Sequence, residues 1–255
     1  MYFCKYVDGI KGFKVQDLLD LAKKAAVIAG NEILDIKHPL IMTKPDGSPI
    51  SSADLKANEI IFEILSQSKI NICSEEKILS YEQRKNAPFW LVDPLDGTKN
   101  YLKNRNNFCV CISLIDGTRP ILGLIYDVCN KNIYYAVKDG KVYKNHDILG
   151  KNKLESNKAL ISLSKTQIDL NSQIPKKYNY KPLDIGSALK FCALLEGDAD
   201  VYLRYEVLNS WDIAAGDFLI NQSGGLMIGL DKREINYNMK DFSTKSFIAL
   251  SNVFN

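Results

Sequence analysis

Two aspartates, Asp93 and Asp96, lie three residues apart where the apolar segment 89–92 ends. Pro94 and Gly97 beside them are typical of a tight, non-helical corner. Carboxylates at the end of a buried strand repel each other and are costly to bury unless a cation lies between them. Since this stretch offers oxygen donors and neither histidine nor cysteine, the ion it favours is Mg²⁺ or one like it. The corner therefore predicts metal-assisted chemistry on a phosphate.

Other acidic residues stand beside turn or helix-start signals elsewhere in the chain: Asp54, Glu75, Glu76 and Asp212. Taken singly, each has a structural explanation. Asp54 follows Ser51 by three residues and would complete a capping box. Asp212 would lie in the first turn of a helix, where the helix dipole favours an acid. Glu75 and Glu76 would form a solvated strand end.

Hydrophobic periodicity predicts the elements that must position these acids. Helical spacing of apolar residues is found in 15–37, from about 51 to 65, in 187–195 and in 211–222. Shorter apolar segments bounded by turn residues predict strands at 70–73, 89–92, 108–115, 121–128, 133–137, 141–143, 159–163, 201–204 and 246–251. Short turns join the strands between 108 and 143, which is typical of an antiparallel meander. The polar segment 43–49 reads as a turn cluster.

The composition, 46% hydrophobic and 25% charged residues in 255, is typical of a globular protein. The net charge of +3 is small and dispersed, so no nucleic-acid partner is expected. The chain shows neither a signal peptide nor an apolar stretch of membrane-spanning length. We therefore expect a cytoplasmic protein, either free or peripheral at the inner face of the membrane. Whether two copies form a homodimer stays open.

Cysteine and histidine usage excludes several chemistries. The six cysteines lie mostly inside apolar segments without CxxC spacing, which favours reduced core residues over disulfides or a zinc site. The two histidines, His38 and His146, lie in polar turn regions. A Ser-His-Asp hydrolase, a phosphohistidine mechanism and a histidine-rich zinc site are therefore not expected.

Taken together, four blocks resemble a known superfamily: Asp54, then 74–76 (Ser-Glu-Glu), then 93–98 (Asp-Pro-Leu-Asp-Gly-Thr), then 211–216 (Trp-Asp-Ile-Ala-Ala-Gly). Their order and spacing are similar to those of the lithium-sensitive, Mg²⁺-dependent phosphomonoesterases, which include inositol monophosphatases, fructose-1,6-bisphosphatases and bisphosphate nucleotidases. The resemblance covers nearly the whole chain. It implies an α/β fold, the layered αβαβα sandwich. Residues 1–150 would carry most metal ligands, and 151–255 would supply Asp212 and substrate contacts.

The resemblance also implies a metal site with two or three Mg²⁺ ions. Glu75, Asp93 and the backbone carbonyl of Leu95 would hold one ion. Asp93, Asp96 and Asp212 would hold a second near the leaving oxygen, and Glu75 with water would hold a weaker third. Closely spaced ions of this kind can activate water, stabilise a leaving alkoxide and neutralise phosphoryl charge.

Catalysis, by the same resemblance, would use a hydrogen-bonded pair formed by Thr98 and Asp54. This pair would orient or deprotonate the attacking water. Glu75 would share in catalysis through its ions, and Glu76 would support this network from behind the ligands.

Further segments resemble the bacterial 3′(2′),5′-bisphosphate nucleotidase branch, which is associated with sulfate assimilation. Lys99 after the acidic corner, the segment 184–192 and an arginine eight residues before Asp212 are its marks. The branch implies substrate contacts from Gly97, Thr98, Lys99, Gly186, Ser187, Lys190 and Arg204. As ordinary residues, the lysines and the arginine would be surface cations, and Gly186 with Ser187 would cap a helix.

The branch implies a small phosphorylated nucleotide as partner and removal of the 3′-phosphate of 3′-phosphoadenosine 5′-phosphate, giving AMP and phosphate. Departures from it occur at Asn100 and at 205–208, where Glu206 resembles a sugar-binding glutamate of inositol phosphatases but stands one residue closer to Asp212. Inositol-1-monophosphatase or another sugar phosphatase is therefore the alternative. A non-catalytic nucleotide-binding sensor is the alternative from a different class.

Overall fold

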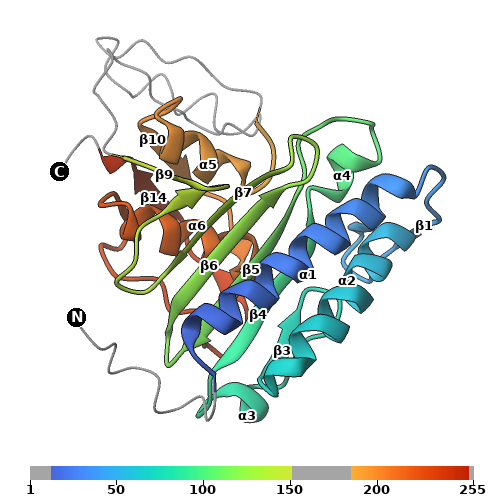
Figure 1. Ribbon diagram of the computed structural model, residues 1–255, viewed down its shortest axis with the longest axis horizontal. Helices are drawn as coiled ribbons and strands as arrows, with labels where there is room; N and C mark the ends of the chain where they lie inside the picture. The colour runs from blue at the N-terminus through green and yellow to red at the C-terminus, as the bar shows by residue number, and fades with distance from the viewer. Residues whose placement is uncertain (1–12, 151–184, 253–255) are drawn as a thin grey trace.

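The computed structural model describes residues 13–150 and 185–252. Their elements are stacked in layers: a pair of helices, a seven-stranded sheet, a second pair of helices and a small sheet (Figure 1). These are four layers of the αβαβα sandwich predicted from the sequence, and the α/β fold class is confirmed. None of the helices described is long and apolar enough to cross a membrane.

The large sheet has the strand order β3-β4-β5-β6-β7-β8-β9. Its members are β3 (Asn71–Ser74), β4 (Phe89–Asp96), β5 (Cys109–Asp116), β6 (Arg119–Asp127), β7 (Asn132–Val137), β8 (Tyr143–Lys144) and β9 (Asp147–Ile148). β3 and β4 run parallel, and every later pair of neighbours is antiparallel. The predicted antiparallel meander is therefore confirmed.

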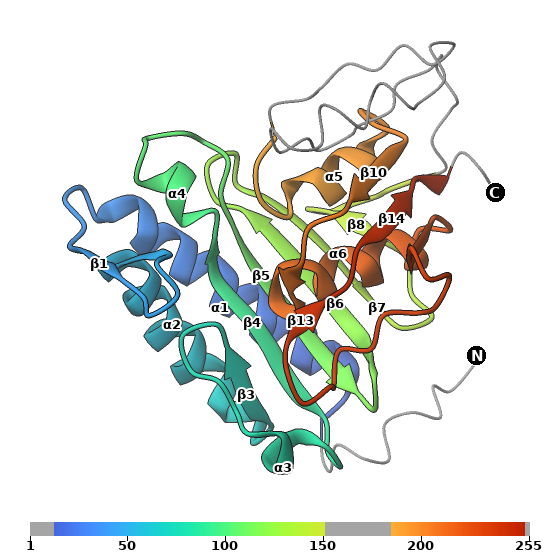
Figure 2. The same cartoon turned by 180° about the vertical axis from the view of Figure 1, so that it is seen from behind.

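Helices cover both faces of this sheet. The first pair, α1 (Val15–Asp35) and α2 (Ser52–Leu65), packs on one face (Figure 1). The second pair, α5 (Leu189–Glu196) and α6 (Ser210–Gln222), lies on the other face, as the view from behind shows (Figure 2). Helix α6 has little amphipathic contrast because it is buried between the large sheet and the small one.

Side chains of strand β5 alternate between the two hydrophobic cores on either face of the large sheet. Val110, Ile112 and Leu114 are buried beneath α1 and α2, whereas Cys109 and Cys111 are buried in the core that contains α5 and α6. Successive side chains of a strand point to opposite faces of a sheet, so a strand covered on both sides is apolar throughout.

The remaining elements are short. They are the hairpin of β1 (Ile41–Thr43) and β2 (Pro49–Ser51), the 3₁₀ helix Ser66–Ser68, α3 (Tyr81–Arg84), α4 (Thr98–Tyr101), the small sheet of β10 (Val201–Arg204), β14 (Phe247–Leu250) and β12 (Leu226–Gly229), and the pair β11 (Leu208–Asn209) and β13 (Ser243–Thr244).

An ion pair between a half-buried arginine and a buried aspartate links the large sheet to α6. The guanidinium of Arg119, at the start of β6, donates to both carboxylate oxygens of Asp217 over 2.7 and 3.0 Å. The hydroxyl of Tyr237 donates to the same carboxylate over 2.6 Å. Asp217 is fully buried, so its charge depends on these partners.

Some sequence expectations need correction. Helix α5 begins at Leu189, two residues later than predicted, because Ser187 has a φ of +53° and cannot continue a right-handed helix. Ser187 is therefore not the helix cap considered from the sequence. The polar segment 43–49 is the tip of the β1–β2 hairpin, whose strands were not predicted. The predicted strand 159–163 and the division at residue 150 involve residues outside those described, and both stay predictions.

Candidate metal centre

The acidic corner at the end of β4 is built by a break in the strand ladder. The β4–β5 register shifts between Asp93 and Asp96, and the backbone N–H of Leu95 donates to the Asp93 carboxylate over 3.0 Å. Gly97 follows with a φ of +105°, and a Cβ there would lie 2.7 Å from the carbonyl oxygen of Asn107. Only glycine fits this turn, which follows directly after the two aspartates at the end of β4.

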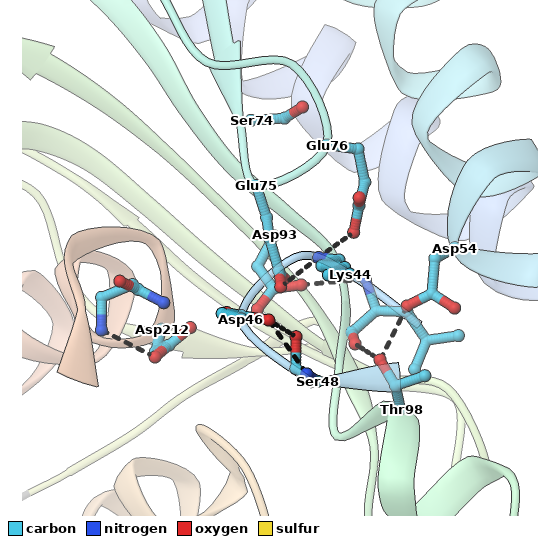
Figure 3. Close-up of polar contacts among 12 residues, drawn as sticks. Lys44, Asp46, Ser48, Asp54, Ser74, Glu75, Glu76, Asp93, Thr98 and Asp212 are labelled. Carbon is cyan, nitrogen blue, oxygen red and sulfur yellow. Dashed lines mark hydrogen bonds and ion pairs between the residues drawn. The ribbon is translucent and has the colours of Figure 1, made fainter. Parts of the chain in front are cut away.

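Glu75 and Glu76 reach the same place because β3 runs parallel to β4. Ser74 is in register with Val92, and the N–H of Glu75 donates to the Val92 carbonyl over 3.1 Å. β3 therefore ends level with Val92, and Glu75 lies next to Asp93 (Figure 3).

Asp212 arrives from the first turn of α6. Asp212 lies in the first turn of the helix as predicted, and its carboxylate also caps the helix by accepting the backbone N–H of Asn209 over 3.0 Å. Asp212 can serve both as a first-turn acid of the helix and as a metal ligand, since the same carboxylate faces the corner formed by Asp93 (Figure 3). Four acids from three segments of the chain thus converge.

The electrostatics of the corner favour a positive charge. Burial, followed by repulsion from Glu75, Asp96 and Asp212, raises the pKa of Asp93 well above its usual value. Burial and Asp96 likewise raise the pKa of Asp212. Burial raises the pKa of Asp96 to about 6, although the N–H of Ala188 and the charge of Lys190 oppose the shift. A multivalent cation would remove this repulsion.

The predicted contact between Thr98 and Asp54 is present. Thr98 Oγ1 lies 2.7 Å from Asp54 Oδ1 and 3.2 Å from the carbonyl oxygen of Leu95. The other oxygen, Asp54 Oδ2, accepts the N–H and the hydroxyl of Ser51 over 2.8 and 2.6 Å. Asp54 is only 2% exposed, so its capping contacts fix the oxygen that faces Thr98.

Lys44 was not predicted as part of the site. It follows β1 in the hairpin, and its ammonium lies 2.6 Å from Glu75 and 2.8 Å from Glu76 (Figure 3). Burial lowers the pKa of Lys44, but its hydrogen bonds to the two glutamates outweigh that effect and raise the pKa overall. The only sequence signal was the turn cluster 43–49, which does not indicate a contact 31 residues away.

A cavity of about 160 Å³ adjoins the corner. Its walls are Asp96, Ser187, Ala188, Lys190, Phe191, Tyr202, Arg204, Leu208, Asp212 and Ile213. Three predicted substrate residues, Ser187, Lys190 and Arg204, are therefore brought together with two of the acids. Arg204 also forms an ion pair with Glu206 over 2.6 Å.

The other predicted substrate residues are placed differently. Lys99 is exposed on α4 and does not line this cavity. Gly186 packs so closely that a Cβ would lie 2.2 Å from the side-chain amide of Asn100. The structure thus gives Gly186 a packing role against Asn100, the residue that departs from the branch pattern.

Comparison with known proteins bears on this layered fold and its acidic corner. The model of the inositol monophosphatase family matches residues 14–252. The chain is 36% identical over 243 residues to the 3′(2′),5′-bisphosphate nucleotidase CysQ of Buchnera aphidicola subsp. Acyrthosiphon pisum, covering 91% of each. It is 32% identical over 237 residues to the CysQ nucleotidase of Shigella flexneri, covering 88% of this chain and 95% of the relative.

Among solved structures, the chain is similar to CysQ from Bacteroides thetaiotaomicron, a bacterial member of the inositol monophosphatase family. The TM-score is 0.81 at 29% identity, over 93% of this chain and 97% of that one. The fold and site thus define a layered α/β phosphatase. The chain belongs to the inositol monophosphatase family, whose members are metal-dependent phosphatases, generally with Mg²⁺.

Proposed function

We propose that the chain hydrolyses the 3′-phosphate of 3′-phosphoadenosine 5′-phosphate, giving AMP and inorganic phosphate. The observation that carries this proposal is the convergence of Glu75, Asp93, Asp96 and Asp212 beside the Thr98–Asp54 pair. The nucleotide is favoured because the relatives at 32% and 36% identity are bisphosphate nucleotidases.

The donors of the corner fit Mg²⁺. They are hard oxygens, and burial with mutual repulsion raises the pKa of three of them in the absence of a cation. Glu75, Asp93, Asp96, Asp212 and the Leu95 carbonyl would hold two or three ions. Bound there, the ions would lower the pKa of a water and offset charge on the phosphoryl and leaving oxygens.

The Thr98–Asp54 pair supplies the direction of proton movement. If the Thr98 hydroxyl donates to Asp54 Oδ1, its oxygen lone pair is left to accept a proton from the attacking water. Ser51 holds the Asp54 carboxylate in place by two hydrogen bonds. Water placed at Thr98 would thus be held with its lone pair free for phosphorus.

The cavity supplies cationic partners for the second phosphate or the ribose. Lys190 and Arg204 line it together with Ser187. The Nε of Arg204 is buried and has no hydrogen-bond partner among the described residues, and a buried guanidinium nitrogen without a partner is suited to an anionic oxygen. Roles for Gly97, Thr98 and Lys99 in substrate contact, and for Glu76 behind the ligands, belong to the same proposal.

The test is phosphate release with Mg²⁺ from 3′-phosphoadenosine 5′-phosphate, inositol 1-phosphate and fructose 1,6-bisphosphate, side by side. We expect clear preference for the nucleotide, and inhibition by lithium as the family resemblance implies. Preference for a sugar phosphate would overturn the substrate assignment and leave the metal site standing. Nucleotide binding without phosphate release from any substrate would instead identify a non-catalytic sensor.

A further inference from the structure

Two thiols lie directly against the acidic corner. Cys109 and Cys111 are two residues apart on β5, so both point to the same face of the sheet, and their sulfurs are 3.9 Å apart. The β4–β5 register places Cys109 opposite Asp96. Asp96 Oδ2 is 3.8 Å from Cys109 Sγ, and one donor atom from each of the three residues lies within 4.8 Å of the others.

Both separations measured from Cys109 Sγ match the edges of a tetrahedral site for a thiophilic cation. With Zn–S bonds of about 2.3 Å and Zn–O bonds of about 2.1 Å, a tetrahedron has S···S and S···O edges of about 3.8 and 3.6 Å. The observed separations are 3.9 Å between the sulfurs and 3.8 Å from Cys109 to Asp96. Ser187 Oγ, 3.4 Å from Cys109 Sγ, offers an oxygen for the fourth position.

A disulfide is a poorer fit for the same pair. Alternate residues of a strand have Cα atoms about 6.4–6.8 Å apart, which is the far end of the range that disulfides span. Both cysteines are free thiols, and their sulfurs would have to approach by nearly half their separation. A cation between them requires almost no movement.

The cavity gives an ion a path to these buried thiols. Cys109 and Cys111 are at most 1% exposed, but Asp96 and Ser187 line the 160 Å³ cavity, and both contact Cys109. An ion that enters beside Asp96 would therefore meet the two sulfurs next.

We propose that Cys109, Cys111 and Asp96 form a binding site for a borderline-soft divalent cation such as Zn²⁺ or Cd²⁺, with Ser187 or water as fourth ligand. Each thiol releases its proton to water as its metal–sulfur bond forms. Thiolate ligands prefer such ions over Mg²⁺, so this site differs in chemistry from the carboxylate corner. Both cysteines are buried free thiols, as predicted from the sequence, and the proposal adds a metal-binding role that the sequence did not favour.

Asp96 belongs to both the thiophilic site and the proposed Mg²⁺ site, so the two sites should affect each other. This expectation rests on the proposed function. A carboxylate drawn toward the sulfurs is withdrawn from the Mg²⁺ site. Zn²⁺ should therefore inhibit phosphate release even when Mg²⁺ is in large excess.

The test is titration of the full chain with Cd²⁺ in excess Mg²⁺, followed by the ultraviolet charge-transfer absorption of cadmium–thiolate bonds. We expect one equivalent to bind with this absorption, and Cys109→Ser and Cys111→Ser each to weaken binding at least about tenfold. Cys73→Ser is the matched control, because Cys73 is also fully buried but lies on β3 outside the cluster. Titration without the absorption, or unchanged binding in both variants, would overturn the proposal.

Measurements of phosphate release distinguish failure of the thiophilic site from failure of the proposed phosphatase function. Thermal unfolding verifies that each variant is folded, and Cys109→Ala with Cys111→Ala provides a second pair if serine disturbs the core. Cd²⁺ binding through the thiols with no phosphate release from any substrate would contradict the proposed function and leave the thiophilic site intact. Normal turnover that Zn²⁺ inhibits equally in wild type and both alanine variants would contradict the thiophilic site alone.

Discussion

Replacing Asp96 with asparagine should stabilise the protein when Mg²⁺ is removed. The pKa of Asp96 rises from 3.8 to about 6 on folding, which corresponds to about 3 kcal/mol of unfavourable free energy for the ionised form. Because the pKa is higher in the folded state, protonation of Asp96 stabilises the folded protein. This stabilisation is complete below pH 4 and is lost as the pH rises through 6. Asparagine carries no charge and can still accept the 2.5 Å hydrogen bond from the N–H of Ala188.

The assay is thermal unfolding of wild type and Asp96→Asn in a chelator at pH 5 and pH 8. At pH 8 the variant should be the more stable by up to about 3 kcal/mol, which is about 6–12 °C for a chain of this size. At pH 5 the gap should shrink, because wild-type Asp96 is then largely protonated. Adding Mg²⁺ should stabilise the variant less than wild type, because only the ion held by Glu75, Asp93 and the Leu95 carbonyl keeps all its ligands, and phosphate release by the variant should fall at least about 100-fold.

The control is Asp147→Asn, which removes a charge from the exposed strand β9 and should change neither stability nor turnover. The reasoning is refuted if Asp96→Asn is no more stable than wild type in chelator at pH 8. It is also refuted if Mg²⁺ stabilises the variant as much as wild type and the variant keeps its turnover.

Three further substitutions test other parts of the structure. Thr98→Ala should lower kcat at least about 100-fold by removing the hydroxyl that contacts Asp54, whereas Thr98→Ser should retain most activity; equal rates would exclude the proton path. Arg119→Met leaves Asp217 buried without its cation and should cost about 3–5 kcal/mol in urea unfolding, so unchanged stability would contradict the ion-pair argument. Gly97→Ala places a Cβ 2.7 Å from a carbonyl oxygen at a φ of +105°; a loss of about 1–3 kcal/mol is expected, and a variant as stable as wild type would show that the turn can relax.

Long elements were predictable because their periodicity reports burial directly. Helices α2 and α6 were predicted to within about one residue at each end, since Asp54 and Asp212 are acids of the kind that the first helical turn favours. Strand β10 matches its predicted bounds, and the meander from β5 to β8 follows from apolar segments separated by short turns. The acids gathered at the corner were predicted as candidates because they recur beside such boundaries.

Other features depend on contacts that no local pattern encodes. Lys44 meets Glu75 and Glu76 only because the β1–β2 hairpin folds toward the end of β3. The positive φ of Ser187, which delays the start of α5, is a conformation that the residue type does not predict. Cross-strand register decides that Cys109 faces Asp96, so the thiols could be recognised as buried but not as neighbours of the acidic corner.

The most direct test of the central claim is anomalous diffraction from crystals grown with Mn²⁺, an ion that oxygen ligands bind much as they bind Mg²⁺. We expect anomalous peaks within bonding distance of Asp93, shared with Glu75 on one side and with Asp96 and Asp212 on the other. Crystals in which Mn²⁺ is bound elsewhere, with no peak at Asp93, would contradict the assignment of this corner as the metal centre of a phosphatase.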